Sequence, residues 1–271
     1  MFFTPNVLVE KGDKLIVIQK DATFRSLQKQ FHDEGIVNDM VTFSFVARIM
    51  GFDRQIRPGR YPLRGNMSNL DAIRALRQGG QRAGVKLTFS HARKMDELAG
   101  KITANIGVTQ EELMTELDRF IADSSMNKEG FTRDNIISMF IPNTYEVFFN
   151  VTPADLVERM HAEYRDFWNA QRLEKAKVAG LKPLEVSVLA SIVQAESSKA
   201  MEAPIIAGLY INRLRNDIPL QADPTLIFAI GDFSIKRVLN THKEIESPYN
   251  TYKYTGLPPG PVALPYIATI D

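Results

Sequence analysis

The sequence contains no cysteine. This absence excludes thiol catalysis, disulfide bonds and cysteine-ligated zinc sites, and it suits an oxidising compartment without fixing one. Histidine is scarce as well. The four histidines, His32, His91, His161 and His242, lie far apart in the sequence, and no two have the H-x-x-x-H spacing that places two ligands on one helix face. We therefore expect no metal site.

Long apolar runs and an excess of either charge are also missing. No stretch approaches about 18 uninterrupted apolar residues, the minimum for a helix that spans a membrane. The 33 basic and 32 acidic side chains give a formal net charge of +1, which argues against a dedicated nucleic-acid binder. What the chain does have is 271 residues, of which 44% are hydrophobic. This is enough to bury the core of one large domain or of two to three small ones.

Two segments in the first 160 residues share one spacing of apolar residues. In each, an apolar residue of a predicted strand is followed by apolar positions of a predicted amphipathic helix at offsets of six, nine and thirteen. The two sets are Ile18, Phe24, Leu27 and Phe31, and Phe89, Met95, Leu98 and Ile102. We therefore predict two copies of one strand–helix–helix–strand–helix unit, over residues 13–80 and 85–165.

The match continues into the second half of each segment. Tyr61 is followed at seven residues by Ser68, and Tyr145 is followed at the same offset by Thr152. Both Ser68 and Thr152 are candidate N-caps of a helix. A shared scaffold or spacer is one interpretation of the two copies, and a pair of binding modules is the other.

From about residue 170 the pattern changes to helices followed by a long polar loop. The stretch "LASIVQAESSKA" (189–200) reads as the end of an apolar helix, yet Glu196 lies on the same face as Leu189 and Val193. Partial burial would raise the pKa of this carboxyl and keep it protonated near neutral pH, as a general acid requires. The alternative is a buried glutamate that pairs with a cation such as Arg213.

Asp223 and Arg213 each have more than one interpretation. Asp223 precedes Pro224, so we expect it to cap the helix that begins there, although a cap beside a cleft can also touch a substrate. Arg213 lies three residues after Tyr210 and points inward with it. An inward arginine is expected to pair with a carboxylate, which Glu196, Asp223 or an anionic substrate could supply.

Tyr249, Asn250 and Tyr252 lie in a loop rich in tyrosine, asparagine, glycine and proline. Aromatic faces pack on the C–H surfaces of pyranose rings, and amides form hydrogen bonds with hydroxyl and N-acetyl groups. These residues therefore suit sugar recognition. The alternative is a tyrosine-bearing loop that packs over its own core.

In order, "ASIVQAES", "INRL", "LQADPT" and "SPYNTYKYTGLPPGPVALP" resemble the motifs of the MltG (YceG-like) family of endolytic peptidoglycan transglycosylases. The motif-bearing region covers about residues 185–265, and the paired repeat upstream, whose first copy resembles a LysM-like module, is similar to the family's N-terminal part. The resemblance implies an α+β fold, with duplicated LysM-like βααβ-type modules before a mainly helical catalytic domain with long loops. The expected boundaries are 1–82 and 83–165 for the modules and 166–271 for the catalytic domain.

The resemblance also implies a reaction. A lytic transglycosylase cleaves the MurNAc–GlcNAc β-1,4 bond and leaves a 1,6-anhydro-MurNAc end, with one carboxyl that acts first as acid and then as base. The family's catalytic glutamate matches Glu196, in the pair Glu196–Ser197. Many relatives carry a further glutamate where this chain has Gln194, and helix geometry turns Gln194 away from the Glu196 face. No cofactor is expected. The residues expected to bind substrate are Asn212, Arg213, Gln221, Asp223, Thr225, Tyr249, Asn250 and Tyr252.

Relatives usually begin with a cytoplasmic tail and one transmembrane helix, and they continue beyond the point where this sequence ends. The resemblance therefore implies the periplasmic part of a protein anchored in the inner membrane, with a truncated C-terminus.

Glycan strands of peptidoglycan are the expected partner, and peptidoglycan synthases are candidate partners. A muramidase that uses water and a non-catalytic wall-binding scaffold stay open as alternatives. A pyridoxal phosphate lyase, suggested by an older family label, would need a phosphate-binding loop, and none is apparent.

Overall fold

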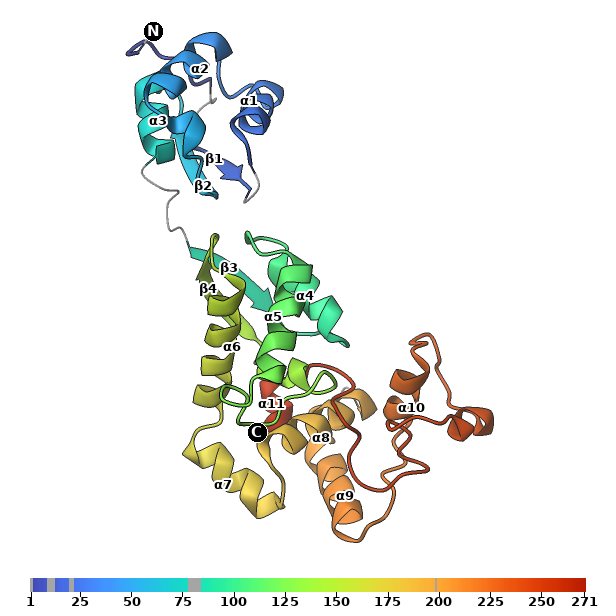
Figure 1. Ribbon diagram of the computed structural model, residues 1–271. Helices are drawn as coiled ribbons and strands as arrows, with labels where there is room; N and C mark the ends of the chain where they lie inside the picture. The colour runs from blue at the N-terminus through green and yellow to red at the C-terminus, as the bar shows by residue number, and fades with distance from the viewer. Residues whose placement is uncertain (1, 9–12, 20–21, 78–83, 198) are drawn as a thin grey trace. The chain divides into compact units, whose positions relative to one another are not determined.

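The computed structural model describes residues 2–8, 13–19, 22–77, 84–197 and 199–271 (Figure 1). By their internal contacts the residues divide into two compact units. Unit 1 comprises Met1–Lys86, Asn105–Val108 and Glu146–Val151, and unit 2 comprises Leu87–Ala104, Thr109–Tyr145 and Thr152–Asp271. Most of the predicted second module therefore shares a unit with the predicted catalytic domain, and the three domain boundaries stay predictions.

Unit 1 is built on a two-stranded sheet with helices packed against it. Its elements are β1 (Asp13–Ile18), α1 (Phe24–Asp33), α2 (Met40–Ile49), the 3-10 helix η1 (Phe52–Arg54), β2 (Gly59–Arg64) and α3 (Asn69–Arg77). β1 pairs antiparallel with β2, so that Ile18 lies opposite Gly59. The predicted apolar positions Ile18, Leu27 and Phe31 are buried in one core, as a helix with a single apolar stripe requires.

The next elements repeat the order strand, helix, helix, strand, helix. They are β3 (Gly84–Phe89), α4 (Met95–Thr103), α5 (Gln110–Ala122), the 3-10 helix η2 (Ile136–Met139), β4 (Asn143–Phe148) and α6 (Pro153–Phe167). β3 and β4 form a second two-stranded sheet. The predicted positions Phe89, Met95, Leu98 and Ile102 are buried, although Phe24, the counterpart of Met95 in the first copy, is only half-buried.

The two predicted N-caps are confirmed. The Ser68 hydroxyl accepts a hydrogen bond from the Asp71 N–H at 3.2 Å, and the Thr152 hydroxyl accepts one from the Asp155 N–H at 3.1 Å. In both cases the bond satisfies an N–H in the first turn of the helix that would otherwise have no partner.

The remaining chain of unit 2 is helical, with one long loop. Its elements are α7 (Ala170–Ala179), α8 (Pro183–Glu196), α9 (Ala203–Arg215), α10 (Asp223–Ile230), the 3-10 helix η3 (Asn240–Glu244) and α11 (Ile267–Ile270). Gly180 ends α7 with a φ of 80°, a left-handed conformation that glycine adopts without steric cost. Leu189, Ile192 and Val193 of α8 are buried in a core with Tyr210 of α9. Pro183 and Pro204 lie in the first turns of α8 and α9, where the missing N–H of proline leaves no helix hydrogen bond unmade.

The described structure is therefore a mixed fold, in which helices are the main elements and two small sheets complete it. Among the described residues, no single helix has the length and apolar character to cross a membrane, and α7 with α8, bent by 73°, meets those criteria only as a pair. Within the same residues, no three acidic or histidine side chains gather in a way that could hold a metal ion.

Candidate active site

Glu196 is the last residue of α8, at the point where the apolar helix meets solvent. The helix face behind it is buried through Val193, and Ser197 continues the chain in an extended conformation. The residue as a whole is exposed, so the expected partial burial does not cover the whole side chain. Protein atoms nevertheless surround the carboxyl group closely enough that loss of hydration raises its pKa. The raised pKa was the property expected of a general acid.

Tyr210 of α9 is the direct partner of Glu196. The buried tyrosine donates its hydroxyl hydrogen to Glu196 Oε2 at 3.3 Å. This hydrogen bond favours the ionised carboxylate and therefore works against the effect of burial on the pKa of Glu196. The sequence pattern placed Tyr210 only as an inward neighbour of Arg213. An inward tyrosine on the helix that follows a candidate acid was the signal that could have identified it.

Asp223 does not cap α10, so that prediction was wrong. The N-cap position is Ala222, and Asp223 is the first residue of the helix. Its carboxylate instead accepts a hydrogen bond from the Tyr252 hydroxyl, at 2.5 Å. Burial, and then this bond, raise the pKa of Tyr252 to about 12, so the phenol stays protonated and remains a donor. The negative charge of Asp223 in turn adds to the increase in the pKa of Glu196.

Arg213 has no carboxylate partner within the described part of the chain, so neither Glu196 nor Asp223 supplies the expected pairing. Its guanidinium donates to the carbonyl oxygens of Pro219 at 2.8 Å and Leu220 at 3.2 Å, and to Gln221 Oε1 at 3.0 Å. Gln221 has a φ of 55°, a left-handed conformation that costs free energy in a residue other than glycine. Arg213 therefore secures the strained loop that leads into Asp223.

The geometry brings four side chains into one electrostatic group, which we call the Glu196 cluster: Glu196, Tyr210, Asp223 and Tyr252. Hydrogen bonds join them in pairs, and the Coulomb interaction between the two carboxylates couples the pairs. The positive charge of Arg213 lowers the pKa values of Tyr210 and Tyr252, but burial and the nearby carboxylates raise both values by more. Two carboxyl groups in different surroundings, one of them with a raised pKa, are typical of sites that cleave glycosidic bonds.

The model of the YceG-like family matches residues 16–271 of the chain. The chain belongs to the YceG-like family. It is 27% identical over 263 residues to proteins named endolytic murein transglycosylase in two strains of Streptococcus pneumoniae, with 88% of this chain and 47% of theirs covered. It is 27% identical over 275 residues to the protein of the same name in Bacillus subtilis, with 94% and 74% covered. The chain thus spans about half the length of the pneumococcal relatives.

A solved structure shares the fold of this YceG-like chain. A YceG-like protein from Listeria monocytogenes aligns with a TM-score of 0.59 and 22% sequence identity, over 96% of this chain and 89% of the other.

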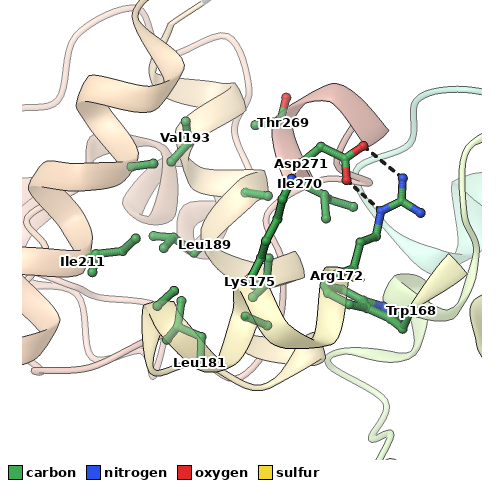
Figure 2. Close-up of a pocket in the computed structure, with 15 residues that line it drawn as sticks. Trp168, Arg172, Lys175, Leu181, Leu189, Val193, Ile211, Thr269, Ile270 and Asp271 are labelled. Atoms are coloured by element: carbon green, nitrogen blue, oxygen red, sulfur yellow. Dashed lines mark hydrogen bonds and ion pairs between the residues drawn. The ribbon is translucent and has the colours of Figure 1, made fainter. Parts of the chain in front are cut away.

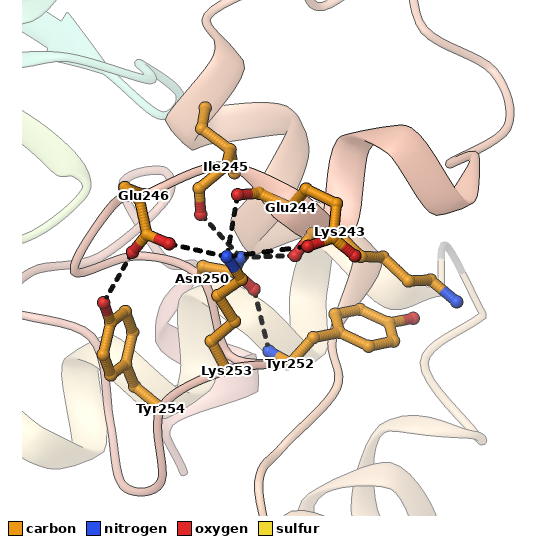
Figure 3. A network of polar contacts seen from close by, with 8 residues as sticks. All are labelled: Lys243, Glu244, Ile245, Glu246, Asn250, Tyr252, Lys253 and Tyr254. Atoms are coloured by element: carbon orange, nitrogen blue, oxygen red, sulfur yellow. Dashed lines mark hydrogen bonds and ion pairs between the residues drawn. The ribbon is translucent and has the colours of Figure 1, made fainter.

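In this YceG-like chain, Asn250 is a structural residue of the loop before α11. It is completely buried, and its Nδ2 donates to the carbonyl oxygens of Lys243 at 2.9 Å and Ile245 at 2.8 Å (Figure 3). Its Oδ1 accepts a hydrogen bond from the backbone N–H of Tyr252 at 3.0 Å. Asn250 therefore holds the loop that presents Tyr252 to Asp223, and its amide is not free for a sugar.

Thr225 has a similar structural role at the start of α10. It is completely buried, and its hydroxyl bonds with the Ala222 carbonyl oxygen at 2.8 Å and with the Thr251 hydroxyl at 2.9 Å. The Gln221 N–H donates to the Thr251 carbonyl at 2.9 Å. The start of α10 and the loop before α11 are thus fastened together, which fixes Asp223 against Tyr252.

Tyr249 and Asn212 lie apart from the Glu196 cluster. The Tyr249 ring is buried and packs on Phe228 with centroids 4.8 Å apart, and Asp134, not Glu196, is the charge that acts on its hydroxyl. Asn212 is exposed on α9. The structure therefore joins Asp223 and Tyr252 to Glu196, places Arg213 and Gln221 beside them, and gives Thr225 and Asn250 supporting positions.

Gln194 has a structural role at the end of α8. Its side-chain Nε2 donates to the Leu264 carbonyl at 3.3 Å, and its Oε1 accepts from the Tyr266 N–H at 2.6 Å. Both partners lie in the segment that leads into α11. This supports the interpretation of Gln194 as a bystander to the chemistry.

One cavity lies among α7, α8, α9 and α11 (Figure 2). It has a volume of about 200 Å³, and its lining is mainly apolar, with Leu189, Val193 and Ile211 among its walls. Arg172 and Asp271 form an ion pair at 2.6 Å in this lining. No residue of the Glu196 cluster lines this cavity, so we assign no chemistry to it.

Proposed function

We propose that this YceG-like chain is an endolytic lytic transglycosylase of the cell envelope, which cleaves the MurNAc–GlcNAc β-1,4 bond of peptidoglycan during cell-wall assembly. The carrying observation is the raised pKa of a single carboxyl, Glu196, held by Tyr210 at the end of a buried helix. The relatives named endolytic murein transglycosylase supply the substrate class.

In the proposed reaction, Glu196 donates its proton to the glycosidic oxygen as the bond from C1 of MurNAc to that oxygen breaks. The carboxylate that remains then accepts the proton of the C6 hydroxyl of the same sugar, while O6 bonds to C1. The product carries a 1,6-anhydro ring, no water is consumed, and Glu196 regains its proton. One carboxyl is therefore sufficient for both steps.

The other members of the Glu196 cluster prepare this acid. Loss of hydration and the charge of Asp223 favour the protonated form of Glu196, and the Tyr210 hydrogen bond limits the effect. Tyr252 holds the Asp223 carboxylate in place at 2.5 Å. Opposing influences of this kind can set the pKa of a group that must both give and accept a proton.

Replacement of the acid tests the proposal. We expect Glu196→Gln to lower the release of anhydro-muropeptides about 100-fold or more, because the amide cannot donate an acidic proton. Mass spectrometry of digested peptidoglycan measures the products, and circular dichroism checks that the fold is kept. Glu174→Gln on α7, at an exposed position, is the matched control. Wild-type product release by Glu196→Gln would refute the assignment.

A muramidase reaction is the second candidate, and the charge of Asp223 beside Glu196 favours it. Hydrolysis normally needs a second carboxylate that activates water or forms a covalent intermediate. Digestion in ¹⁸O-labelled water separates the two reactions: a muramidase puts the label on the new reducing end, whereas a transglycosylase gives unlabelled anhydro ends that are one water lighter.

We also propose that residues 13–80 and 85–165 are two copies of one LysM-like unit that binds glycan. Support comes from the equal element order and from the tyrosines at equivalent positions, Tyr61 and Tyr145. Each hydroxyl donates to the carbonyl oxygen four residues earlier, at 2.6 Å. Titration of N-acetylglucosamine oligomers into Glu196→Gln tests binding, and two copies that serve only as a spacer predict none. The alternative of a non-catalytic wall-binding protein predicts binding without cleavage by the wild-type chain. A periplasmic location on an inner-membrane anchor and cooperation with synthases stay predictions.

A further inference from the structure

A second, larger cavity begins beside Glu196. It has a volume of about 570 Å³, within the range of sites that bind small molecules or short peptide segments. Ala195 and Ser197, the two neighbours of Glu196 in the chain, both line it. The catalytic carboxyl and this cavity therefore share the last turn of α8 and the residues that follow.

The lining of the cavity combines apolar residues with positively charged ones. Ile227, Phe228 and Val262 are among the apolar residues, and Arg93 and Lys199 supply two permanent positive charges. Among the described residues that line the cavity, none is an aspartate or glutamate. A cavity with cations and no carboxylate of its own is suited to an anionic ligand.

Arg93 is the cation that a ligand can use. Its guanidinium lies over the Phe233 ring, 4.4 Å from the centroid, and within the described residues its side chain makes no ion pair with a carboxylate. The nearby Glu97 accepts a hydrogen bond from the Arg93 backbone N–H at 2.8 Å and pairs with Lys101. Lys199, by contrast, already pairs with Glu202 at 3.0 Å. Stacking on an aromatic ring holds a guanidinium flat with its N–H edges free, as carboxylate recognition requires.

We propose that this cavity binds the peptide stem of the MurNAc residue whose bond is cleaved, with a stem carboxylate held by Arg93. The inference rests on the proposed function and deepens it. The cleaved bond leaves C1 of MurNAc, and the same ring carries the stem through its lactyl group at C3. Any productive complex therefore places a stem close to Glu196, whose two neighbours in the chain line the cavity.

The chemistry of a stem matches both kinds of lining residue. A stem is a short peptide rich in alanine that carries free carboxylates, so its methyl groups suit the wall of Ile227 and Val262 and its anionic groups suit Arg93. The stems therefore determine which strands bind tightly. A strand without stems, or one whose stem carboxylates are amidated, loses a charge-assisted hydrogen bond to Arg93. Such a loss typically weakens binding about tenfold.

Binding by the Glu196→Gln chain tests this inference without depending on catalysis. Calorimetry compares three soluble glycan strands of equal length: strands with free stem carboxylates, strands with amidated stems, and strands from which an amidase has removed the stems. We expect the first to bind about tenfold more tightly than the other two. Adding Arg93→Gln to Glu196→Gln should abolish that difference and leave binding of the stripped strands unchanged.

Arg165→Gln, added to Glu196→Gln in the same way, is the matched control, because Arg165 is exposed on α6 and its loss changes the net charge equally. Equal affinity for all three strands overturns the inference. So does a stem preference that survives Arg93→Gln, or one that Arg165→Gln abolishes equally. The proposed function fails separately, when the wild-type chain releases no more product than Glu196→Gln.

Discussion

At the scale of single residues, the proposed site depends on how three influences shift the ionisation equilibrium of Glu196. Burial and the Asp223 charge raise the pKa of Glu196, and the Tyr210 hydrogen bond lowers it. A general acid is active while protonated, so activity falls as pH rises through its pKa. The pH at which cleavage is lost on the alkaline side therefore reports the balance of these influences.

Two substitutions should move that pH in opposite directions. Asp223→Asn removes a negative charge, so Glu196 ionises more easily. The alkaline limb of the kcat/KM profile therefore shifts to lower pH. Tyr210→Phe removes a donor that favours the carboxylate, so the limb shifts to higher pH. Profiles of anhydro-product release measure both shifts. Movement in the same direction, or none in either variant, would show that these residues do not tune Glu196.

At the scale of elements, the loop before α11 is held by buried amide hydrogen bonds more than by its exposed ion pairs. Asn250 makes three hydrogen bonds to loop backbone while completely buried (Figure 3). Lys253 pairs with Glu246 at 2.7 Å on an exposed surface of the same loop. Removing the partner of a buried polar group lowers the free energy of unfolding far more than removing one member of an exposed ion pair.

We expect Asn250→Ala to lower the free energy of unfolding by about 2–4 kcal/mol and to loosen the loop, because three backbone groups lose their partner. Lys253→Ala should cost less than about 1 kcal/mol. Denaturant titration gives the stabilities, and hydrogen exchange of residues 239–254 shows where protection is lost. Equal effects of the two changes would contradict the assigned role of Asn250.

At the scale of the whole molecule, the chain has two compact units, and every residue of the Glu196 cluster belongs to unit 2. Unit 1 has its own core, in which Phe43 of α2 is completely buried and packs against Phe31 with ring centroids 5.4 Å apart. Stability of unit 1 and chemistry at Glu196 thus depend on different sets of contacts.

Phe43→Ala should destabilise unit 1 by about 3–5 kcal/mol, since it leaves a cavity in a packed core. Cleavage of short soluble strands should persist, because the residues that we propose as catalytic lie in unit 2. Val41→Ala, on the same helix at a position that is 80% exposed, should change stability by less than about 0.5 kcal/mol. Limited proteolysis and a cleavage assay on both variants decide the matter. Loss of cleavage in Phe43→Ala would refute the separation.

The sequence by itself determined the helices and strands, their capping residues Ser68 and Thr152, and Glu196 as the candidate acid, because periodicity and capping are local properties of the chain. Only the tertiary structure decided what surrounds that acid. The Tyr210–Glu196 and Tyr252–Asp223 bonds join residues 14 and 29 positions apart. Likewise, the Arg213 guanidinium donates to backbone carbonyl oxygens and not to a carboxylate. Such partners depend on how α8, α9, α10 and the loop before α11 meet, which no local pattern specifies.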